Sequence, residues 1–372
     1  MTMQRQAAIW LIALAVFVFA LYELSNVLLP FVAALALGYL LDPVADRLER
    51  WGMSRLMATL TILVVFLLVA LLVAMIAAPI LARQTAGFIE AFPKLLMRLQ
   101  ALASEQGAAL LERWGLRIAE RLGVDPSVAA GDLQKAANDM LGKAGQWLIG
   151  FFTSLLSGGA ALVGLVSLLV ITPVVAFYVL LDWDHMVEAI DANLPRDHRE
   201  TIHQLARDID AAMAGFLRGQ SLVCLFLGLW YGLGLTLVGV NYGLLIGVVG
   251  GLLSFIPYVG SMTVFLLSVT VAIVQGWPGW TLPALAVAVV ATGQFLEGNV
   301  LTPRLVGQSV GLHPVWLMFA LLAFGSLFGF VGLLVAVPVA AALGVLARHG
   351  LAQYRRSRLF LGTQRRMDDV AP

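Results

Sequence analysis

The run QSLVCLFLGLWYGLGLTLV, residues 220–238, contains no charged side chain. It opens a region of about 130 residues, between Arg218 and Arg348, whose only formally charged side chains are Glu297 and Arg304. A soluble protein must cover its surface with charge, and about a quarter of its residues are charged on average. This region is therefore expected to lie in lipid and to consist of membrane-spanning helices.

The composition of the whole chain supports the same fold class. The chain is 60% hydrophobic and 12% charged, against about 45–50% and 25% in globular proteins. The sequence therefore predicts an all-α polytopic membrane protein with about eight membrane segments. Arginines cluster at residues 47–55 and from residue 348 onward. Because basic loops stay in the cytoplasm, both termini are predicted to be cytoplasmic.

The distribution of charge divides the chain into six parts. They are N-terminal membrane spans (1–79), an extramembrane arm of amphipathic helices (80–147), a long bent span (148–181), a cytoplasmic amphipathic helix (182–218), a repeat-containing membrane transport core (219–350) and a basic cytoplasmic tail (351–372). The third span is expected to end at Pro79, and the long fourth span to bend at Gly158-Gly159 or at Thr172-Pro173. The arm fits partner binding, substrate gating, or helices that pack on one another.

An internal repeat lies within the transport core. Phe-Ile-Pro-Tyr-Val-Gly at residues 255–260 corresponds to Leu-Phe-Gly-Phe-Val-Gly at residues 327–332, and each sits in the middle of a long apolar segment. Each segment is either one bent crossing or a re-entrant pair of half-helices. The re-entrant arrangement places Arg304 in the cytoplasm, as the positive-inside rule requires, so the sequence favours it.

Interrupted apolar segments at matching places in two repeats are typical of transporter sites, because unwound backbone offers free N–H and C=O groups. Glycine and proline that merely permit close helix packing are the alternative. Gly298-Asn299 and Thr302-Pro303 are expected to stop a helix, so Glu297 should stand at its carboxyl end. Either Arg304 or water compensates this carboxylate, or Glu297 takes up a proton or a cation. The candidate solute and ion path comprises Glu297, Arg304, Asn299, Gln294, Pro257, Tyr258, Gly260, Gly329 and Gly332.

Catalytic and metal-binding motifs are not found in the sequence. It has no Walker A loop and no H-E-x-x-H motif, its five histidines are scattered, and its single cysteine, Cys224, excludes an intramolecular disulfide. We therefore expect no enzyme activity, no cofactor and no metal site. The arginines of the short tail suit anionic lipid, and no nucleic-acid partner is expected.

Several blocks resemble the autoinducer-2 exporter (AI-2E) family of bacterial permeases. They are FIPYVG at residues 255–260, EGNVLTPRLVGQSVGLHP at 297–314, GFVGLLVAVPVAA at 329–341, YVLLD at 178–182, and Arg218-Gly219-Gln220. The resemblance covers residues 7–350. It implies a soluble arm, homo-oligomeric assembly with a pentamer as one form, and export of a small signalling furanone in quorum sensing. Some relatives are described as sodium/proton antiporters. Trp183-Asp184, after Asp182, departs from the Asp-Arg that the family pattern leads us to expect.

Residues and resemblance together predict a secondary transporter. It would export a small solute similar to autoinducer-2 across the bacterial inner membrane, driven by an ion gradient. A sodium/proton antiporter and a non-transporting membrane scaffold are the alternatives. A scaffold would need neither an intramembrane carboxylate nor interrupted repeats.

Overall fold

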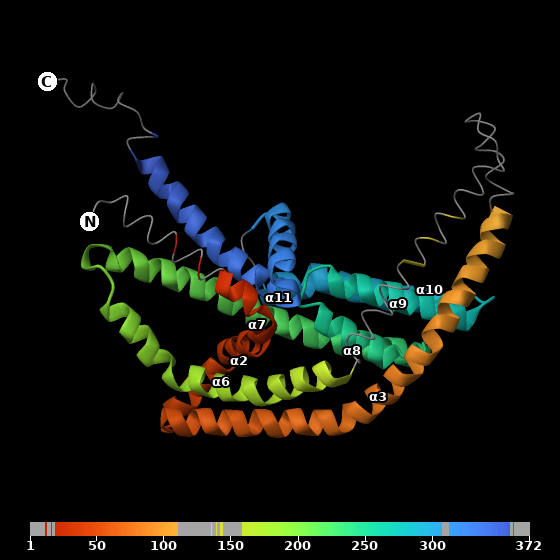
Figure 1. Cartoon of the computed structure of the whole chain (residues 1–372), viewed down its shortest axis with the longest axis horizontal. Helices are drawn as coiled ribbons and strands as arrows, with labels where there is room; N and C mark the ends of the chain where they lie inside the picture. The colour runs from red at the N-terminus through yellow and green to blue at the C-terminus, as the bar shows by residue number, and fades with distance from the viewer. Residues whose placement is uncertain are drawn as a thin grey trace. The chain divides into compact units, whose positions relative to one another are not determined.

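A computed structural model describes residues 19–110, 158–306 and 312–357, together with residues 12, 16, 135, 139, 142, 143 and 360. Every element within these ranges is helical (Figure 1). The elements are α2 (Ser25–Arg50), α3 (Arg55–Leu110), α6 (Gly158–Ala192), the 3₁₀ turn η2 (Arg196–His198), α7 (Arg199–Val238), α8 (Gly243–Leu253), α9 (Val259–Gly276), α10 (Thr281–Leu296), the π-helix η3 (Glu297–Val306) and α11 (Pro314–Arg356). Seven helices in this described part are long and apolar enough to cross a membrane. The predicted all-α polytopic fold is confirmed.

Helix α3 runs past the end that the sequence predicted for the third span. The third span was expected to stop at Pro79, but α3 continues through Pro79 and Pro93 to Leu110. Tertiary packing outweighs the lost backbone bonds, because Phe88 and Phe92 of this extension are 1% and 5% exposed. Residues 111–134, the middle of the predicted arm, lie outside the described residues.

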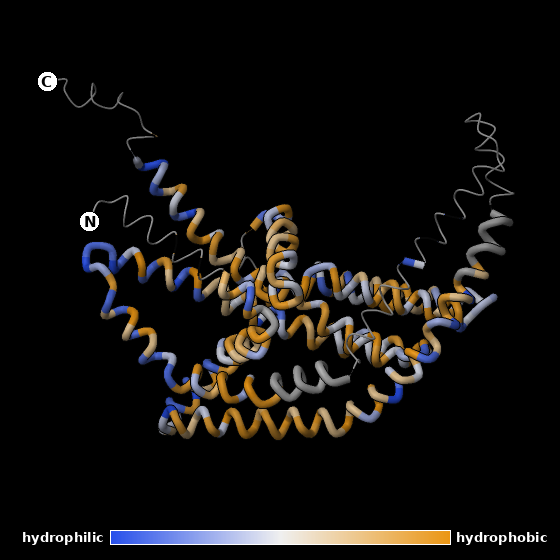
Figure 2. The backbone as a smooth tube through the Cα atoms, in the orientation of Figure 1, coloured by the Kyte–Doolittle hydropathy of each residue, from blue (hydrophilic) through white to orange (hydrophobic). Residues whose placement is uncertain are grey.

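The predicted cytoplasmic helix at residues 182–218 is not a separate element. The structure divides it between the end of α6, which is continuous through Pro173, and the first half of α7, which continues into a membrane-length apolar run. Hydrophilic residues lie around the turn between these two helices (Figure 2). Helical phasing alone could not locate this turn, because both flanking segments are amphipathic.

The described chain forms two compact units. The first unit contains residues 1–67, 166–223 and 298–372, and the second contains residues 68–165 and 224–297. Helices α3 and α7 each pass from one unit into the other along the chain.

In the second unit, α7 and α8 form an antiparallel pair held by glycines. A Cβ atom added to Gly247 would lie 2.0 Å from the backbone N of Gly232, and one added to Gly251 would lie 2.3 Å from the Cα of Gly228. Spacing by four places these glycines on one face of each helix, so the two backbones approach without side chains between them. The middle of α3 also contacts α8, because the Gln84 side chain accepts a hydrogen bond from Leu245 N at 2.8 Å.

Helices α8 and α9 form a hairpin that turns at residues 254–258. A Cβ on Gly250 would meet the Val264 side chain, and one on Gly260 would lie 2.3 Å from the Ser254 backbone N. At the far end of α9, the Gln275 side chain accepts from Asn241 N at 2.9 Å and donates to Gly239 O at 2.8 Å. The end of α9 therefore returns to the turn that precedes α8.

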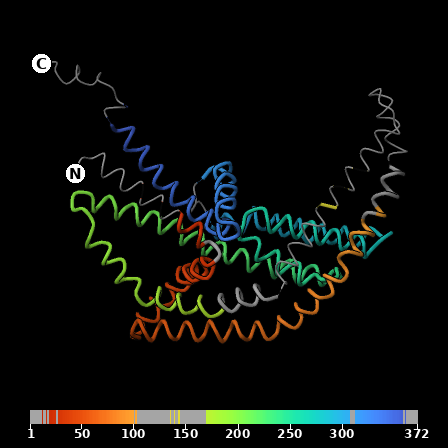
Figure 3. The backbone as a smooth tube through the Cα atoms, in the orientation of Figure 1, coloured from red at the N-terminus to blue at the C-terminus, as the bar shows by residue number. Residues whose placement is uncertain are grey.

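The second repeat reverses in the same way. Helix α11 is interrupted at Gly329, where φ is 58° and ψ is −136°, and its two parts meet at a sharp angle (Figure 3). A Cβ on Gly332 would lie 1.9 Å from Phe324 O. In a straight α-helix, residues eight apart would be about 12 Å apart along the axis. Both interruptions predicted by the repeat are thus confirmed, and both have the form of hairpins instead of gentle bends.

In the first unit, α2 and α6 run parallel. A Cβ on Gly38 would lie 3.0 Å from the Val179 side chain, and Thr172 Oγ1 donates to Pro30 O at 3.2 Å. At the polar end of this pair, the Arg55 guanidinium binds the carboxylates of Asp42 at 2.8 Å, Asp46 at 3.0 Å and Glu49 at 3.3 Å.

Candidate functional site

Three polar side chains form a hydrogen-bonded network in the second unit, within an otherwise apolar region. The Gln294 amide donates from Nε2 to the Tyr231 hydroxyl oxygen at 3.0 Å and to Glu297 Oε2 at 2.9 Å. Tyr231 is completely buried, while Gln294 and Glu297 are half-buried. In lipid, such groups need protein or ligand partners, because water is scarce and an unmet hydrogen bond is costly.

Close packing makes this network possible. A Cβ on Gly293 would lie 2.4 Å from the Tyr231 ring, so any larger residue at position 293 would push the ring away. One residue earlier on α7, Trp230 donates from its indole nitrogen to Val289 O at 3.1 Å. These two contacts hold α7 against α10 and fix their relative position, so that the Tyr231 hydroxyl lies beside Gln294.

A hollow of about 480 Å³ lies between the start of α9 and the end of α10. Gln294 lines it, and Tyr258 lines it from the turn of the interrupted segment. The other lining residues are Ser261, Met262, Phe265, Val287, Val290 and Ala291. Tyr258 occupies the left-handed region, with φ at 68°, a conformation that a bulky residue adopts only at some cost. This backbone places its side chain, 59% exposed, beside the hollow.

The hollow offers an apolar wall and a few hydroxyl and amide groups, which is the usual character of a small-molecule site. The first turn of α9 also lies beside it, and helix amino ends carry partial positive charge. A small uncharged solute with several oxygen atoms would find both donors and acceptors there. The geometry contains no nucleophile paired with a base among these lining residues.

The structure brings some of the predicted site residues together. Gln294 and Glu297 are in direct contact, and Gln294 and Tyr258 line one hollow. Pro257 and Gly260 lie in the same α8–α9 hairpin, where Gly260 permits the close approach to Ser254. The remaining four predicted residues, Asn299, Arg304, Gly329 and Gly332, belong to the first unit.

Glu297 lies at the carboxyl end of α10, as predicted, but the chain does not stop there. It continues as the π-helix Glu297–Val306, through the Gly298-Asn299 and Thr302-Pro303 pairs that were expected to end the helix. The wider π turn changes the hydrogen-bonding partners, and such turns are frequent at functional sites. Arg304, on this π-helix, has an exposed side chain.

Tyr231 is the member of the network that sequence analysis missed. It lies in the uncharged run at residues 220–238, where an aromatic side chain is most often a lipid or core contact. The Gly-Leu-Trp-Tyr-Gly pattern could have indicated the position of Tyr231. Gly228 and Gly232 face α8, whereas the Tyr231 ring packs on Gly293 of α10. Helical phasing of glycines could therefore have indicated which face of α7 approaches which neighbour.

The Arg218-Gly219-Gln220 block has a structural explanation in the first unit. Arg218 Nε donates to Tyr39 O at 3.0 Å. A Cβ on Gly219 would lie 2.3 Å from Leu305 O, so α7 and the π-helix touch at the backbone. This block thus positions the segment that follows Glu297.

These features define an all-α multi-pass membrane protein with two interrupted helical repeats and a polar site beside one interruption. The chain belongs to the AI-2E transporter family: the model of the AI-2E family transporter matches residues 11–352. The resemblance noted in the sequence blocks is confirmed, and the family is one of transporters and permeases.

Individual relatives agree in length with this chain. PerM of Escherichia coli strain K12, named as a candidate permease, is 32% identical over 330 residues that cover 87% of each chain. YrrI of Bacillus subtilis strain 168, named as a candidate transport protein, is 27% identical over 356 residues that cover 92% of this chain and 94% of YrrI. YueF of the same strain, also named as a candidate transport protein, is 28% identical over 322 residues.

Proposed function

We propose that this protein is a secondary transporter that exports a small oxygen-rich solute, of the autoinducer-2 kind, across the bacterial inner membrane. The observation that carries the proposal is the Tyr231–Gln294–Glu297 network next to the hollow at Tyr258. An interrupted helix is the place where a membrane protein can expose polar backbone to a solute. Family membership supports the transport role, and the volume of the hollow fits a small solute.

Gln294 connects the solute site with the ion site in this proposal. Its amide contacts the Glu297 carboxylate and also lines the hollow. Protonation of Glu297, or binding of a cation to it, would change which hydrogen bond Gln294 can make. The affinity of the hollow for a solute would therefore depend on whether the Glu297 carboxylate is protonated or holds a cation.

A sodium/proton antiporter is the second candidate function. It is favoured by Glu297, which is the only acidic residue between Arg218 and Arg348. In that case the carboxylate would exchange a proton for Na⁺ directly, and the hollow would hold water or lipid. The interrupted repeats do not distinguish the two functions, because both need unwound backbone.

Orientation and assembly belong to the same proposal. We propose that both termini lie in the cytoplasm. The α8–α9 hairpin would then enter the membrane from outside and the α11 hairpin from the cytoplasmic side. At about 1.5 Å per residue, the 11 residues of α8 are about 16 Å long, half of a membrane core. Many apolar side chains of α3 and α7 are exposed in the single chain, such as Leu72 at 59% and Leu225 at 62%, so lipid or further copies of the chain in a homo-oligomer would cover them.

The deciding experiment is transport by purified protein in liposomes. Autoinducer-2, Na⁺ and protons would each be followed under an imposed gradient of the others. Export of autoinducer-2 that requires a proton or sodium gradient supports the first function. Sodium–proton exchange without solute flux would favour the antiporter, and no flux of any kind would favour a scaffold.

A further inference from the structure

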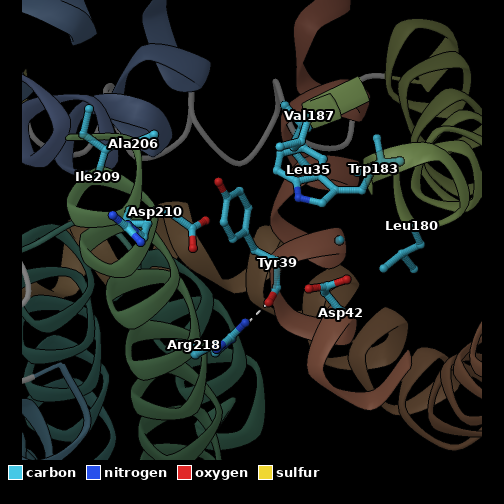
Figure 4. Close-up of a pocket in the computed structure, with 13 residues that line it drawn as sticks. Leu35, Tyr39, Asp42, Leu180, Trp183, Val187, Ala206, Ile209, Asp210 and Arg218 are labelled. Carbon is cyan, nitrogen blue, oxygen red and sulfur yellow. Dashed lines mark hydrogen bonds between the residues drawn. The ribbon is translucent and has the colours of Figure 1, made fainter. Parts of the chain in front are cut away.

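A second hollow, of about 550 Å³, lies within the first unit and has no part in the proposed transport path. Helices α2, α6 and α7 enclose it (Figure 4). Its polar and aromatic lining consists of Tyr39, Asp42, Trp183, Arg207, Asp210 and Arg218. Apolar side chains such as Leu35 and Val187 complete the wall.

The hollow lies where three helices change from apolar to polar. On α2 the apolar run ends at Asp42, on α6 it ends before Asp182, and on α7 the last charge before the membrane-length run is Arg218. Because α2 and α6 run parallel, their polar ends lie at the same level. Arg47 and Arg50 follow on α2, so by the positive-inside rule this level is the cytoplasmic surface of the bilayer.

The walls carry a site for a protonated amine. Tyr39 and Trp183 pack edge to face, with ring centroids 5.9 Å apart and an interplanar angle of 68°. The Asp210 and Asp42 carboxylates lie on either side of the Tyr39 side chain (Figure 4). Arg55 binds Asp42 at 2.8 Å, whereas Asp210 is exposed on α7 and interacts with the Tyr39 side chain. Aromatic faces and carboxylates together favour an ammonium group.

The same hollow also carries donors for an anion. Arg218 uses Nε to bind Tyr39 O at 3.0 Å, which holds its guanidinium at the base of the hollow (Figure 4). Its Nη1 and Nη2 groups are suited to a phosphate oxygen, as is the side chain of Arg207, which also lines the hollow and lies 3.7 Å from the Glu200 carboxylate. Positive and negative groups are therefore both within one hollow at membrane-surface depth.

We propose that this hollow binds the head group of phosphatidylethanolamine from the cytoplasmic leaflet. The primary ammonium would lie between Asp210 and the aromatic pair, the phosphodiester would accept from Arg218, and the acyl chains would leave along Leu35. A purely anionic head group would meet the carboxylates without an ammonium to offset them. A quaternary choline would lack the N–H groups that Asp210 needs as donors.

Lipid retention by the purified full-length protein tests this assignment. Native mass spectrometry would measure the binding of phosphatidylethanolamine, phosphatidylglycerol and phosphatidylcholine, each added at the same concentration. We expect about fivefold stronger retention of phosphatidylethanolamine, the effect of one partly exposed ion pair. Asp210→Asn should abolish this preference. Asp208→Asn is the matched control, because Asp208 is exposed on the same helix but lines a different hollow, with Val345 and His349.

Three results would overturn the assignment. They are equal retention of the three lipids by the parent, an unchanged preference in Asp210→Asn, and an equal loss in Asp208→Asn. Glycerophosphoethanolamine, which has the same head group without acyl chains, tests whether the ligand is a membrane lipid or a soluble molecule. It should not displace the lipid at equal concentration, and displacement would show that the hollow selects a soluble zwitterion instead of a membrane lipid.

Discussion

At the scale of single residues, Glu297 is the group on which ion coupling depends. Its carboxylate accepts from Gln294 at 2.9 Å. Glu297→Gln keeps the shape of the side chain and removes its charge and its titration. We expect solute export to lose its dependence on a proton gradient, because the substituted amide cannot take up or release a proton near pH 7. The measurement is flux in liposomes over a range of external pH.

The control for this variant is Asp184→Asn, which removes an exposed carboxylate of α6 outside the network. It should leave the pH profile of the parent unchanged. If Glu297→Gln exports solute with the parent's pH profile, the carboxylate is structural and the coupling hypothesis is wrong.

Tyr231 tests the network from its buried side. Tyr231→Phe removes the hydroxyl that accepts from Gln294 at 3.0 Å and leaves the ring packed on Gly293. We expect the free energy of unfolding to fall by about 1 kcal/mol, the usual value for one neutral hydrogen bond. Solute flux should fall by more than this stability change explains, because Gln294 would lose its fixed orientation.

Thermal unfolding and flux of the same preparation separate the two effects. Tyr354→Phe, at an exposed position of α11, is the matched control and should change neither. Flux equal to that of the parent in Tyr231→Phe would mean that the hydroxyl contributes only to stability.

At the scale of elements, the glycine contacts decide how closely the half-helices pack. Gly247→Ala would place a Cβ 2.0 Å from the Gly232 backbone N, a contact that only a shift of α8 can relieve. We expect a loss of stability of about 3 kcal/mol, at the upper end of the usual cost of overpacking. Gly350→Ala, where no atom lies within 4 Å, should have almost no effect on the unfolding temperature in detergent. Equal unfolding temperatures for the two variants would contradict the packing of α7 on α8.

The same contacts change how the repeat glycines should be interpreted. Close packing and a solute path were alternatives in the sequence, yet Gly260 and Gly332 each leave no room for a Cβ against the preceding half-helix. These two glycines are therefore required for the close packing of the half-helices. Their part in a solute path stays a prediction.

The elements differ in how far the sequence could predict them. The repeat at residues 255–260 and 327–332 located both interruptions, because glycine and proline act locally on the backbone. The end of α3 and the π-helix after α10 could not be predicted from prolines, since α3 stays helical past Pro79 and the chain stays helical through Pro303. Propensity is overridden where tertiary contacts are strong.

At the scale of the whole molecule, the candidate site was predictable only in part. Gln294 and Glu297 were detectable as rare polar groups in an apolar region, whereas the contribution of Tyr231 depends on how α7 packs against α10. The structure divides the predicted helix at residues 182–218 between α6 and α7, whereas the rest of the six-part division and the orientation in the membrane stay predictions. Both depend on which side each loop faces, and charge counts give that only indirectly.

In the proposed orientation the two hairpins enter the membrane from opposite sides, and the side from which introduced cysteines are labelled decides this. In a protein whose Cys224 is replaced by Ala, single cysteines would be placed at Asn241 and Gly279, at the two ends of the α8–α9 hairpin, and at Ser309, before α11. We predict that an impermeant thiol reagent labels positions 241 and 279 only from outside, and position 309 only from the cytoplasm. Labelling of 241 and 279 from opposite sides would show that α8 and α9 cross the membrane together, and would contradict this account.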